Sequence, residues 1–221
     1  MALIPAYGCE DTVGRVVAGA LRHVEHVLVV DDGSDDDTSA SAATAGAVVI
    51  SHARNLGKGE ALKTGFSYAL SQGFDAVVTL DADGQHDPDE IPRLIEAADG
   101  GAGVVVGARL RDRDKIPLYR YRANMVGVAA ISWRVGQRID DTQSGFRLYK
   151  ADVLSGLKVG ASRFEAETEM LIRAGRRGFR IASVPVTAIY SEEIISRSHY
   201  RKVADTYRIC ILFLKSFLWR R

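Results

Sequence analysis

Short apolar runs alternate with segments of helical periodicity along the first half of the chain. The runs are rich in β-branched residues and end at polar or charged positions, which is typical of buried strands. We expect strands at residues 2–4, 27–30, 47–50 and 76–80, and helices at residues 12–21, 36–45 and 60–70. This alternation predicts an α/β fold with a single doubly wound, mostly parallel (mixed) sheet and helices on both of its faces.

The second half of the chain follows a less regular pattern. We expect helices at residues 90–98, 119–135 and 165–174, strands at 104–106, 147–149 and 179–184, and a terminal amphipathic helix at about 203–219. No linker, internal repeat or low-complexity tract interrupts these segments. Residues 1–221 are therefore expected to form a single domain.

Composition narrows the class of protein. A length of 221 residues suits one well-buried domain, and a net charge of +1 argues against a nucleic-acid partner. Cys9 and Cys210 lie at opposite ends of the chain, form no metal-binding spacing and suit a reducing cytoplasm. No signal peptide is expected before the first strand, and no apolar run reaches the roughly 18 residues of a membrane span.

The stretch that follows the strand at 76–80 carries the clearest chemistry. In extended backbone, Asp81 and Asp83 point to the same side, where their carboxylates repel unless a cation lies between them. Such oxygen ligands suit Mg²⁺ or Mn²⁺ on a diphosphate. An ordinary solvated Asp-Gly turn is the alternative. An EF-hand is excluded, because His86 and Pro92 stand where its glycine and glutamate belong.

A second turn, at residues 55–59, is rich in glycine and contains Lys58. It is not a P-loop, because Gly59 follows the lysine where serine or threonine is required. It is not a dinucleotide fingerprint, because Leu62 replaces the third glycine. Its exposed amides and its lysine would suit a nucleotide or phosphate, and a plain turn at the start of a helix is the alternative.

Five motifs occur in an order and spacing typical of one family. They are Ile4-Pro5-Ala6-Tyr7, Val30-Asp31-Asp32-Gly33-Ser34-Asp35, Asn55-Leu56-Gly57-Lys58-Gly59, Asp81-Ala82-Asp83-Gly84-Gln85-His86 and Asp141-Thr142-Gln143-Ser144-Gly145-Phe146-Arg147. Over roughly residues 2 to 200 the chain resembles the GT-A family 2 glycosyltransferases, and within them the dolichyl- or polyprenyl-phosphate sugar transferases. One departure is Gly8, which stands where the family usually has asparagine.

The resemblance implies a GT-A fold and a role for each motif. The implied nucleotide-binding residues are Pro5, Ala6, Tyr7, Asp32, Lys58, Asp81 and Ala82. The implied ligands of Mg²⁺ or Mn²⁺ are Asp81, Asp83 and Gln85. The residues implied in catalysis are Asp83 through the metal, Asp141 as a base or an acceptor-positioning group, and Arg109, Arg122 and Arg197 as phosphate-binding arginines.

The function that the resemblance implies is inverting transfer of a hexose from a nucleotide sugar, of the GDP-mannose or UDP-glucose type, to a polyprenyl or dolichyl phosphate. One alternative is transfer to a sugar hydroxyl in polysaccharide or surface-glycan synthesis. That reaction needs a general base, whereas a phosphate, with a second pKa of about 6, is already anionic. A second alternative is a nucleotide-sugar-binding protein without turnover. The sequence does not identify the donor, the acceptor or the metal.

Two apolar segments raise the question of a membrane surface. Residues 109–122 are strongly basic, residues 125–131 are apolar, and the terminal apolar segment ends in Trp219, Arg220 and Arg221. A helix of this kind can lie among lipid headgroups, which predicts peripheral attachment on the cytoplasmic face. Packing on the core or in a homodimer is the alternative.

Several acidic residues are expected to be solvated instead of functional. We expect Glu165, Glu167 and Glu169 on a helix surface, with Glu167 or Glu169 facing the sugar as the alternative. Asp140 is expected to be a solvated neighbour of Asp141.

Overall fold

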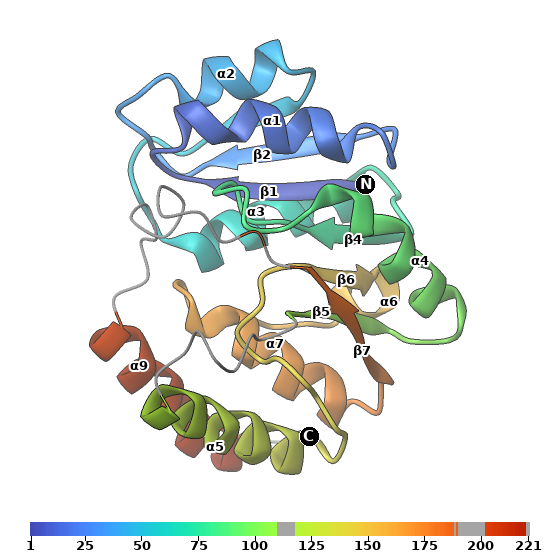
Figure 1. Cartoon of the computed structure of the whole chain (residues 1–221), viewed down its shortest axis with the longest axis vertical. Helices are drawn as coiled ribbons and strands as arrows, with labels where there is room; N and C mark the ends of the chain where they lie inside the picture. Colours follow the sequence, from blue (N-terminus) through green and yellow to red (C-terminus); the bar gives the residue numbers. More distant parts are fainter. Residues whose placement is uncertain (110–117, 188, 190–201, 220–221) are drawn as a thin grey trace.

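Seven strands form one mixed sheet in the computed structural model, which describes residues 1–109, 118–187, 189 and 202–219 (Figure 1). Side chains are described for all of these residues except 118–124 and 202–206. The strands are β1 (Ala2–Ala6), β2 (Val27–Asp31), β3 (Val48–Ser51), β4 (Ala76–Thr79), β5 (Val104–Arg109), β6 (Arg147–Lys150) and β7 (Ile181–Val186). Their order across the sheet is β3-β2-β1-β4-β6-β5-β7.

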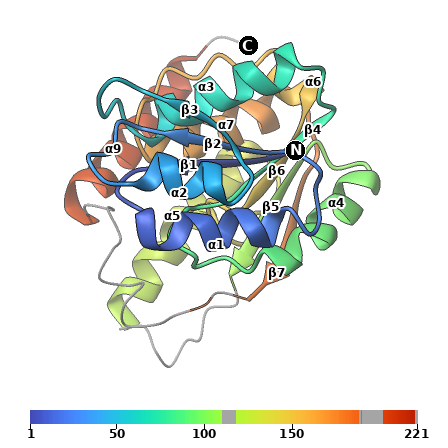
Figure 2. The same ribbon diagram turned by 90° about the horizontal axis from the view of Figure 1, so that it is seen from above.

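Helices cover both faces of this sheet because successive residues of each strand point to opposite sides. The helices are α1 (Glu10–Ala20), α2 (Thr38–Thr44), α3 (Lys58–Ser71), α4 (Ile91–Asp99), α5 (Leu118–Val135), α6 (Ala151–Leu154), α7 (Glu165–Arg176) and α9 (Lys202–Lys215), with 3₁₀ turns η1 (Pro88–Glu90) and η3 (Ser216–Leu218). Ile4 packs in the core beneath α1, α2 and α4, and Leu3 in the core beneath α3, α5 and α7. Figure 2 shows α1 and α3 on opposite sides of the strands.

Strand direction decides where the polar loops meet. β1 pairs in parallel with β2 and β4, and β2 with β3, so these strands end at one edge of the sheet. β6 lies antiparallel between β4 and β5, so the loop that enters β6 lies at the same edge, as does the end of β5. The predicted α/β class with a mixed sheet is confirmed, and this edge gathers the motifs found in the sequence.

Several element boundaries differ from those expected. The strand expected at 179–184 is β7 (Ile181–Val186), and the terminal helix ends at Lys215 and continues as η3. The helix expected at 90–98 is preceded by η1, where the Asp87 side chain accepts a hydrogen bond from the Asp89 backbone N–H and Pro88 occupies the first turn. The short helix α6 was not expected, because four residues are too few to show a periodicity.

Candidate active site

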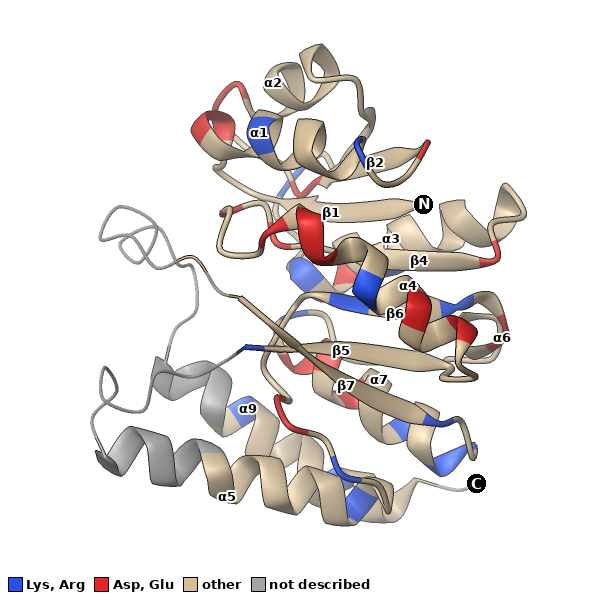
Figure 3. Ribbon diagram, turned by 45° about the vertical axis from the view of Figure 1, so that its right-hand side comes forward, with Lys and Arg blue, Asp and Glu red and all other residues tan. Residues whose placement is uncertain are grey.

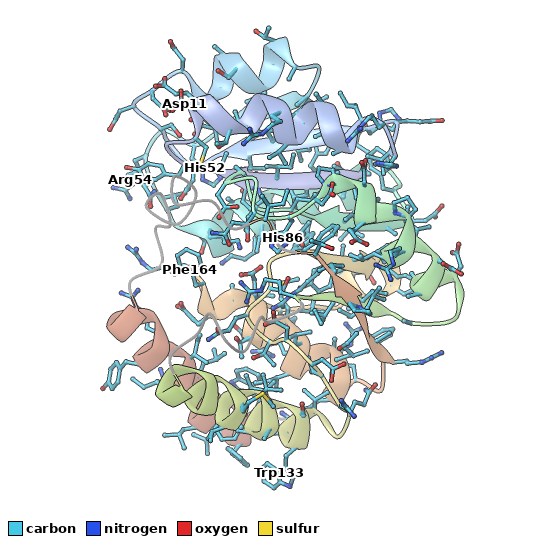
Figure 4. All side chains as sticks on the ribbon, in the orientation of Figure 1. Asp11, His52, Arg54, His86, Trp133 and Phe164 are labelled. Carbon is cyan, nitrogen blue, oxygen red and sulfur yellow. The ribbon has the colours of Figure 1, made fainter. Side chains whose placement is uncertain are left out.

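A cavity of about 650 Å³ opens at the edge of the sheet where β1, β2 and β4 end. Its walls contain ten residues predicted from the sequence: Pro5, Ala6, Tyr7, Asp32, Lys58, Asp81, Ala82, Asp83, Gln85 and Arg109. Figure 4 shows His52, His86 and Phe164, from three separate segments, in the same part of the molecule. The side chain of Arg122 and the whole of Arg197 lie outside the described residues.

The turn after β4 presents Asp81 and Asp83 to this cavity. The backbone N–H of Gln85 donates a hydrogen bond to Asp83 Oδ1 at 2.9 Å, and Thr12 of α1 donates to the Ala82 carbonyl at 2.7 Å. The turn is therefore tied both to itself and to the first helix.

The two carboxylates have opposite electrostatic environments. Asp81 Oδ1 lies 2.5 Å from the Lys58 ammonium, and Asp81 Oδ2 lies 3.6 Å from His86 Nε2. Burial alone would raise the pKa of Asp81, but Lys58 and His86 more than offset it, so this pKa lies well below its usual range. Burial, together with the charge on Asp81, raises the pKa of Asp83. Within the described part of the chain, Asp81 therefore has ion-pair partners in Lys58 and His86, and Asp83 has none.

The donor set fits a divalent cation held jointly with a ligand. The described residues contain no group of three or more His, Cys, Asp or Glu side chains placed to hold a metal. Mg²⁺ binds in this situation through one or two carboxylates, with phosphate and water oxygens completing the shell. Asp81 and Asp83 would supply the protein ligands. The Gln85 side chain lines the same wall.

The glycine turn before α3 is held by Asp32. The backbone N–H groups of Leu56 and Gly57 donate to its two carboxylate oxygens at 2.9 and 2.7 Å, and His52 Nδ1 lies 2.7 Å from Oδ1. Gly57 has a φ of +103°, and a Cβ there would lie 2.5 Å from the Ser162 carbonyl oxygen. The turn therefore needs glycine for close contact with the segment that leads into α7. Asp32 lines the cavity and also fixes the loop that carries Lys58.

The expectation that the glutamates of α7 lie on the helix surface is wrong for Glu167 and Glu169. Glu167 and Glu169 are buried, 6% and 2% exposed, and do not lie on the helix surface. Glu167 Oε2 lies 3.1 Å from Lys58 Nζ, and Glu169 accepts hydrogen bonds from the backbone N–H groups of Gly160 and Ala161. Residues two apart on a helix point to different sides, so one carboxylate faces the cavity and the other binds a loop. No sequence signal in the helix distinguishes these glutamates from surface ones.

Asp141 and Arg109 form a paired unit on the other side of the cavity. Arg109 donates to Asp141 through Nε at 2.8 Å and through Nη2 at 3.3 Å. Asp141 is 1% exposed and lies behind Arg109, which itself lines the wall. Asp140 pairs with Arg138 at the surface, as expected.

Arg147 connects this region to α7, although no role was predicted for it from the sequence. Its guanidinium is fully buried and donates to the backbone carbonyls of Thr142, Ser144 and Glu167. These bonds join the loop that carries Asp141 to the helix that carries Glu167. No apolar run surrounds Arg147, which is the first residue of β6, so its burial and its need for several acceptors become visible only in the structure.

Known proteins resemble this chain over most of its length. A family model described as "Glycosyl transferase family 2" matches residues 1–157. Polyprenol monophosphomannose synthase of Mycolicibacterium smegmatis is 30% identical, over 89% of this chain and 80% of that protein. Undecaprenyl-phosphate mannosyltransferase of Micrococcus luteus is 32% identical, over 87% and 84%. UDP-N-acetylglucosamine–dolichyl-phosphate N-acetylglucosaminyltransferase of Methanococcus voltae is 31% identical, over 88% and 87%.

Solved structures share the fold. Glucosyl-3-phosphoglycerate synthase of Mycobacterium tuberculosis, in complex with phosphoglyceric acid, superimposes with a TM-score of 0.79 and 23% identity, over 100% of this chain and 80% of that one. The same enzyme in complex with Mn²⁺, UDP and glucosyl-3-phosphoglycerate gives the same TM-score and identity. The likeness extends to the whole arrangement of strands and helices.

Proposed function

The chain belongs to glycosyl transferase family 2, and from that premise we propose that it transfers a hexose from a nucleotide sugar to a polyprenyl or dolichyl phosphate. The donor is of the GDP-mannose or UDP-glucose type. The names of the three relatives support this class of acceptor, because one names polyprenol monophosphomannose and the others name a dolichyl phosphate and an undecaprenyl phosphate.

The observation that carries the proposal is the pairing of Asp141 with Arg109. A sugar hydroxyl needs a carboxylate free to take its proton, and Asp141 is buried with both oxygens on a guanidinium. A lipid phosphate is already anionic and needs a positive group that positions it. Arg109 lines the cavity and suits that task through its bidentate geometry. We therefore assign Asp141 as the group that orients Arg109, and Arg109 as a phosphate-binding residue with Arg122 and Arg197.

The donor is proposed to lie along the opposite wall. Pro5, Ala6 and Tyr7 at the end of β1 would contact the nucleoside, and Lys58 would approach the diphosphate. Asp81 and Asp83 would hold Mg²⁺ or Mn²⁺, with Gln85 beside them. When bound, the metal would stabilise charge on the departing nucleoside diphosphate. Attack by the phosphate on the opposite face of the sugar would invert the anomeric carbon in a single displacement.

Attachment to the cytoplasmic face of a membrane belongs to this proposal, because a polyprenyl phosphate is held in a bilayer. No helix in the described ranges has both the length and the apolar character to cross one. Exposed apolar side chains gather on α5, α9 and η3; they are Met125, Val126, Trp133, Tyr207, Leu214, Phe217 and Leu218. The described parts of α5 and α9 carry few charged residues (Figure 3), and Trp133 points away from the body of the molecule (Figure 4).

The test is a screen of UDP- and GDP-sugars against polyprenyl phosphate, with Mg²⁺, Mn²⁺ or EDTA. We expect one nucleotide sugar to support transfer that requires the metal. Asp83→Asn should lower the rate on the order of 100-fold or more, because the metal that would stabilise the leaving group loses an anionic ligand. Asp89→Asn is the matched control, since Asp89 is exposed and pairs with Arg22 and His23 outside the cavity. Transfer to a glycan hydroxyl but to no lipid phosphate would favour the polysaccharide alternative.

A further inference from the structure

Lys58 forms an ion pair with Asp81, the carboxylate that a divalent cation at this site would need as a ligand. Its ammonium lies 2.5 Å from Asp81 Oδ1 and 3.1 Å from Glu167 Oε2, and its side chain is 14% exposed. A cation on Asp81 would meet this positive charge at close range, and like charges at such a distance repel. Lys58 and the metal therefore compete for Asp81.

The backbone that carries Lys58 cannot retreat to relieve this competition. A Cβ on Gly57 or Gly59 would lie 2.5 or 2.6 Å from atoms of Ser162, so the turn is seated directly on the segment before α7. Asp32 holds the same turn from the other side. Only the side chain of Lys58 is free to move, and Glu167 gives it a second anionic partner within reach.

We infer that Lys58 is a resident counter-ion of Asp81, which leaves this carboxylate when the diphosphate of the donor arrives, and that Glu167 is the positioning residue that keeps the ammonium at the site. This inference rests on the proposed function. In the nucleotide-free cavity Lys58 contacts two carboxylates, Asp81 and Glu167, and Asp83 lines the same cavity. A metal that binds without nucleotide displaces the Lys58 ammonium from Asp81 and brings no new anionic partner for it. A metal that arrives with a diphosphate brings a new anionic partner for Lys58, so metal and nucleotide bind together.

The inference is tested by calorimetric titration of the full chain with Mn²⁺, alone and with UDP or GDP. The wild type should bind Mn²⁺ at least about tenfold more tightly with the preferred nucleotide than without it. Lys58→Met should bind Mn²⁺ alone at least about tenfold more tightly than the wild type, and should bind the nucleotide more weakly when Mn²⁺ is present. Lys63→Met, which breaks a surface pair with Glu60 on the same helix, should change neither affinity.

The double variant Lys58→Met/Glu167→Gln separates competition from a general effect of charge, because it restores the net charge of the wild type. We expect it to keep a tighter affinity for Mn²⁺ alone. It also removes the carboxylate that Lys58→Met leaves unpaired, so it serves if the single variant does not fold. Wild-type Mn²⁺ affinity in the folded double variant would overturn the inference, as would absence of any gain in Lys58→Met.

The readouts are independent of turnover, which keeps the two proposals separable. If Mn²⁺ binds more tightly with the nucleotide, as expected, but no sugar is transferred, the proposed function is contradicted and the counter-ion role of Lys58 stands. If sugar is transferred but neither Lys58 variant changes the affinity for Mn²⁺, the counter-ion role is contradicted and the proposed function stands.

Discussion

At the scale of single residues, Asp81 and Asp83 lie in the same acidic turn but have different electrostatic environments. Asp81 faces Lys58 and His86, so its ionised form is stabilised in the folded protein. Asp83 faces the charge on Asp81 and is partly withdrawn from water, so its ionised form is disfavoured. The turn therefore combines one carboxylate whose ionised form is stabilised with one whose ionised form would gain from a cation.

These directions predict how acid affects the protein. The raised pKa of Asp83 means that the folded state binds its proton more tightly than the unfolded state does, so ionised Asp83 costs stability that is recovered as the pH falls through that pKa. In EDTA at pH 7, Asp83→Asn should therefore melt at the same or a higher temperature than the wild type. Metal affinity should begin to fall at a pH above the ordinary aspartate pKa of about 3.9.

Thermal melts in EDTA and Mn²⁺ titrations from pH 7 downward measure both effects. Asp81 contributes in the opposite sense, because its lowered pKa gives stability that is present above about pH 4 and is lost only as the pH falls through that lower value. A clear drop in melting temperature for Asp83→Asn in EDTA would contradict the inference that ionised Asp83 costs the folded protein stability.

At the scale of elements, the loop that enters β6 is fitted against the end of β4. Thr79 of β4 donates a hydrogen bond to the Gly145 carbonyl at 2.8 Å, and the buried Arg147 holds the loop from inside. A Cβ on Gly145 would lie 2.5 and 2.7 Å from the two carboxylate oxygens of Asp81. The absence of a side chain at this position therefore sets where Asp81 points.

Gly145→Ala should displace Asp81 and lower the transfer rate by roughly 10- to 100-fold, since misplacement by about 1 Å is costly at a reacting centre. Gly127→Ala is the control, because a Cβ there meets nothing within 4 Å on α5. It should leave the rate unchanged and stabilise the helix by roughly 0.5–1 kcal/mol. Initial rates and thermal melts of both variants provide the comparison, and an unaltered rate for Gly145→Ala would refute this account of Asp81.

At the scale of the whole molecule, the terminal segment has two faces. One packs on α7, where Arg173 stacks on the Trp219 ring at 4.1 Å and Arg176 donates to the Trp219 carbonyl. The other face is exposed and adjoins α5, where the ring centroids of Trp133 and Phe217 lie 5.9 Å apart. Packing on the core and an exposed apolar surface therefore coexist, with Trp219 on the packed side.

The exposed face should bind anionic liposomes at low salt. Leu214→Asp/Leu218→Asp should abolish cosedimentation and lower transfer to a long-chain polyprenyl phosphate, because it places charge on the apolar surface. Val48→Asp, at an exposed apolar position on β3, is the control and should sediment like the wild type. Retention of binding by the double variant would argue against this surface, and a monomer produced from a dimer would identify it as a contact between two copies.

The sequence by itself determined the layers and the position of the site. Alternation of apolar runs with helical segments defines β1 to β4 and their helices, because that periodicity is local. The turn at Asp81 and Asp83 and the glycine turn at Lys58 are local as well. Because parallel strands end at one edge, both turns could be assigned to a common site before the fold was known.

Only the tertiary structure decided what those residues contact. Lys58 meets Glu167 across 109 positions, and Arg109 meets Asp141 across 32. Gly145 lies against Asp81 because β6 inserts antiparallel between β4 and β5. Such contacts leave no periodicity in the sequence, and a glutamate buried against a lysine has the same local pattern as one in water. The electrostatics of the site therefore follow from how distant segments pack, whereas its location follows from the pattern of each segment.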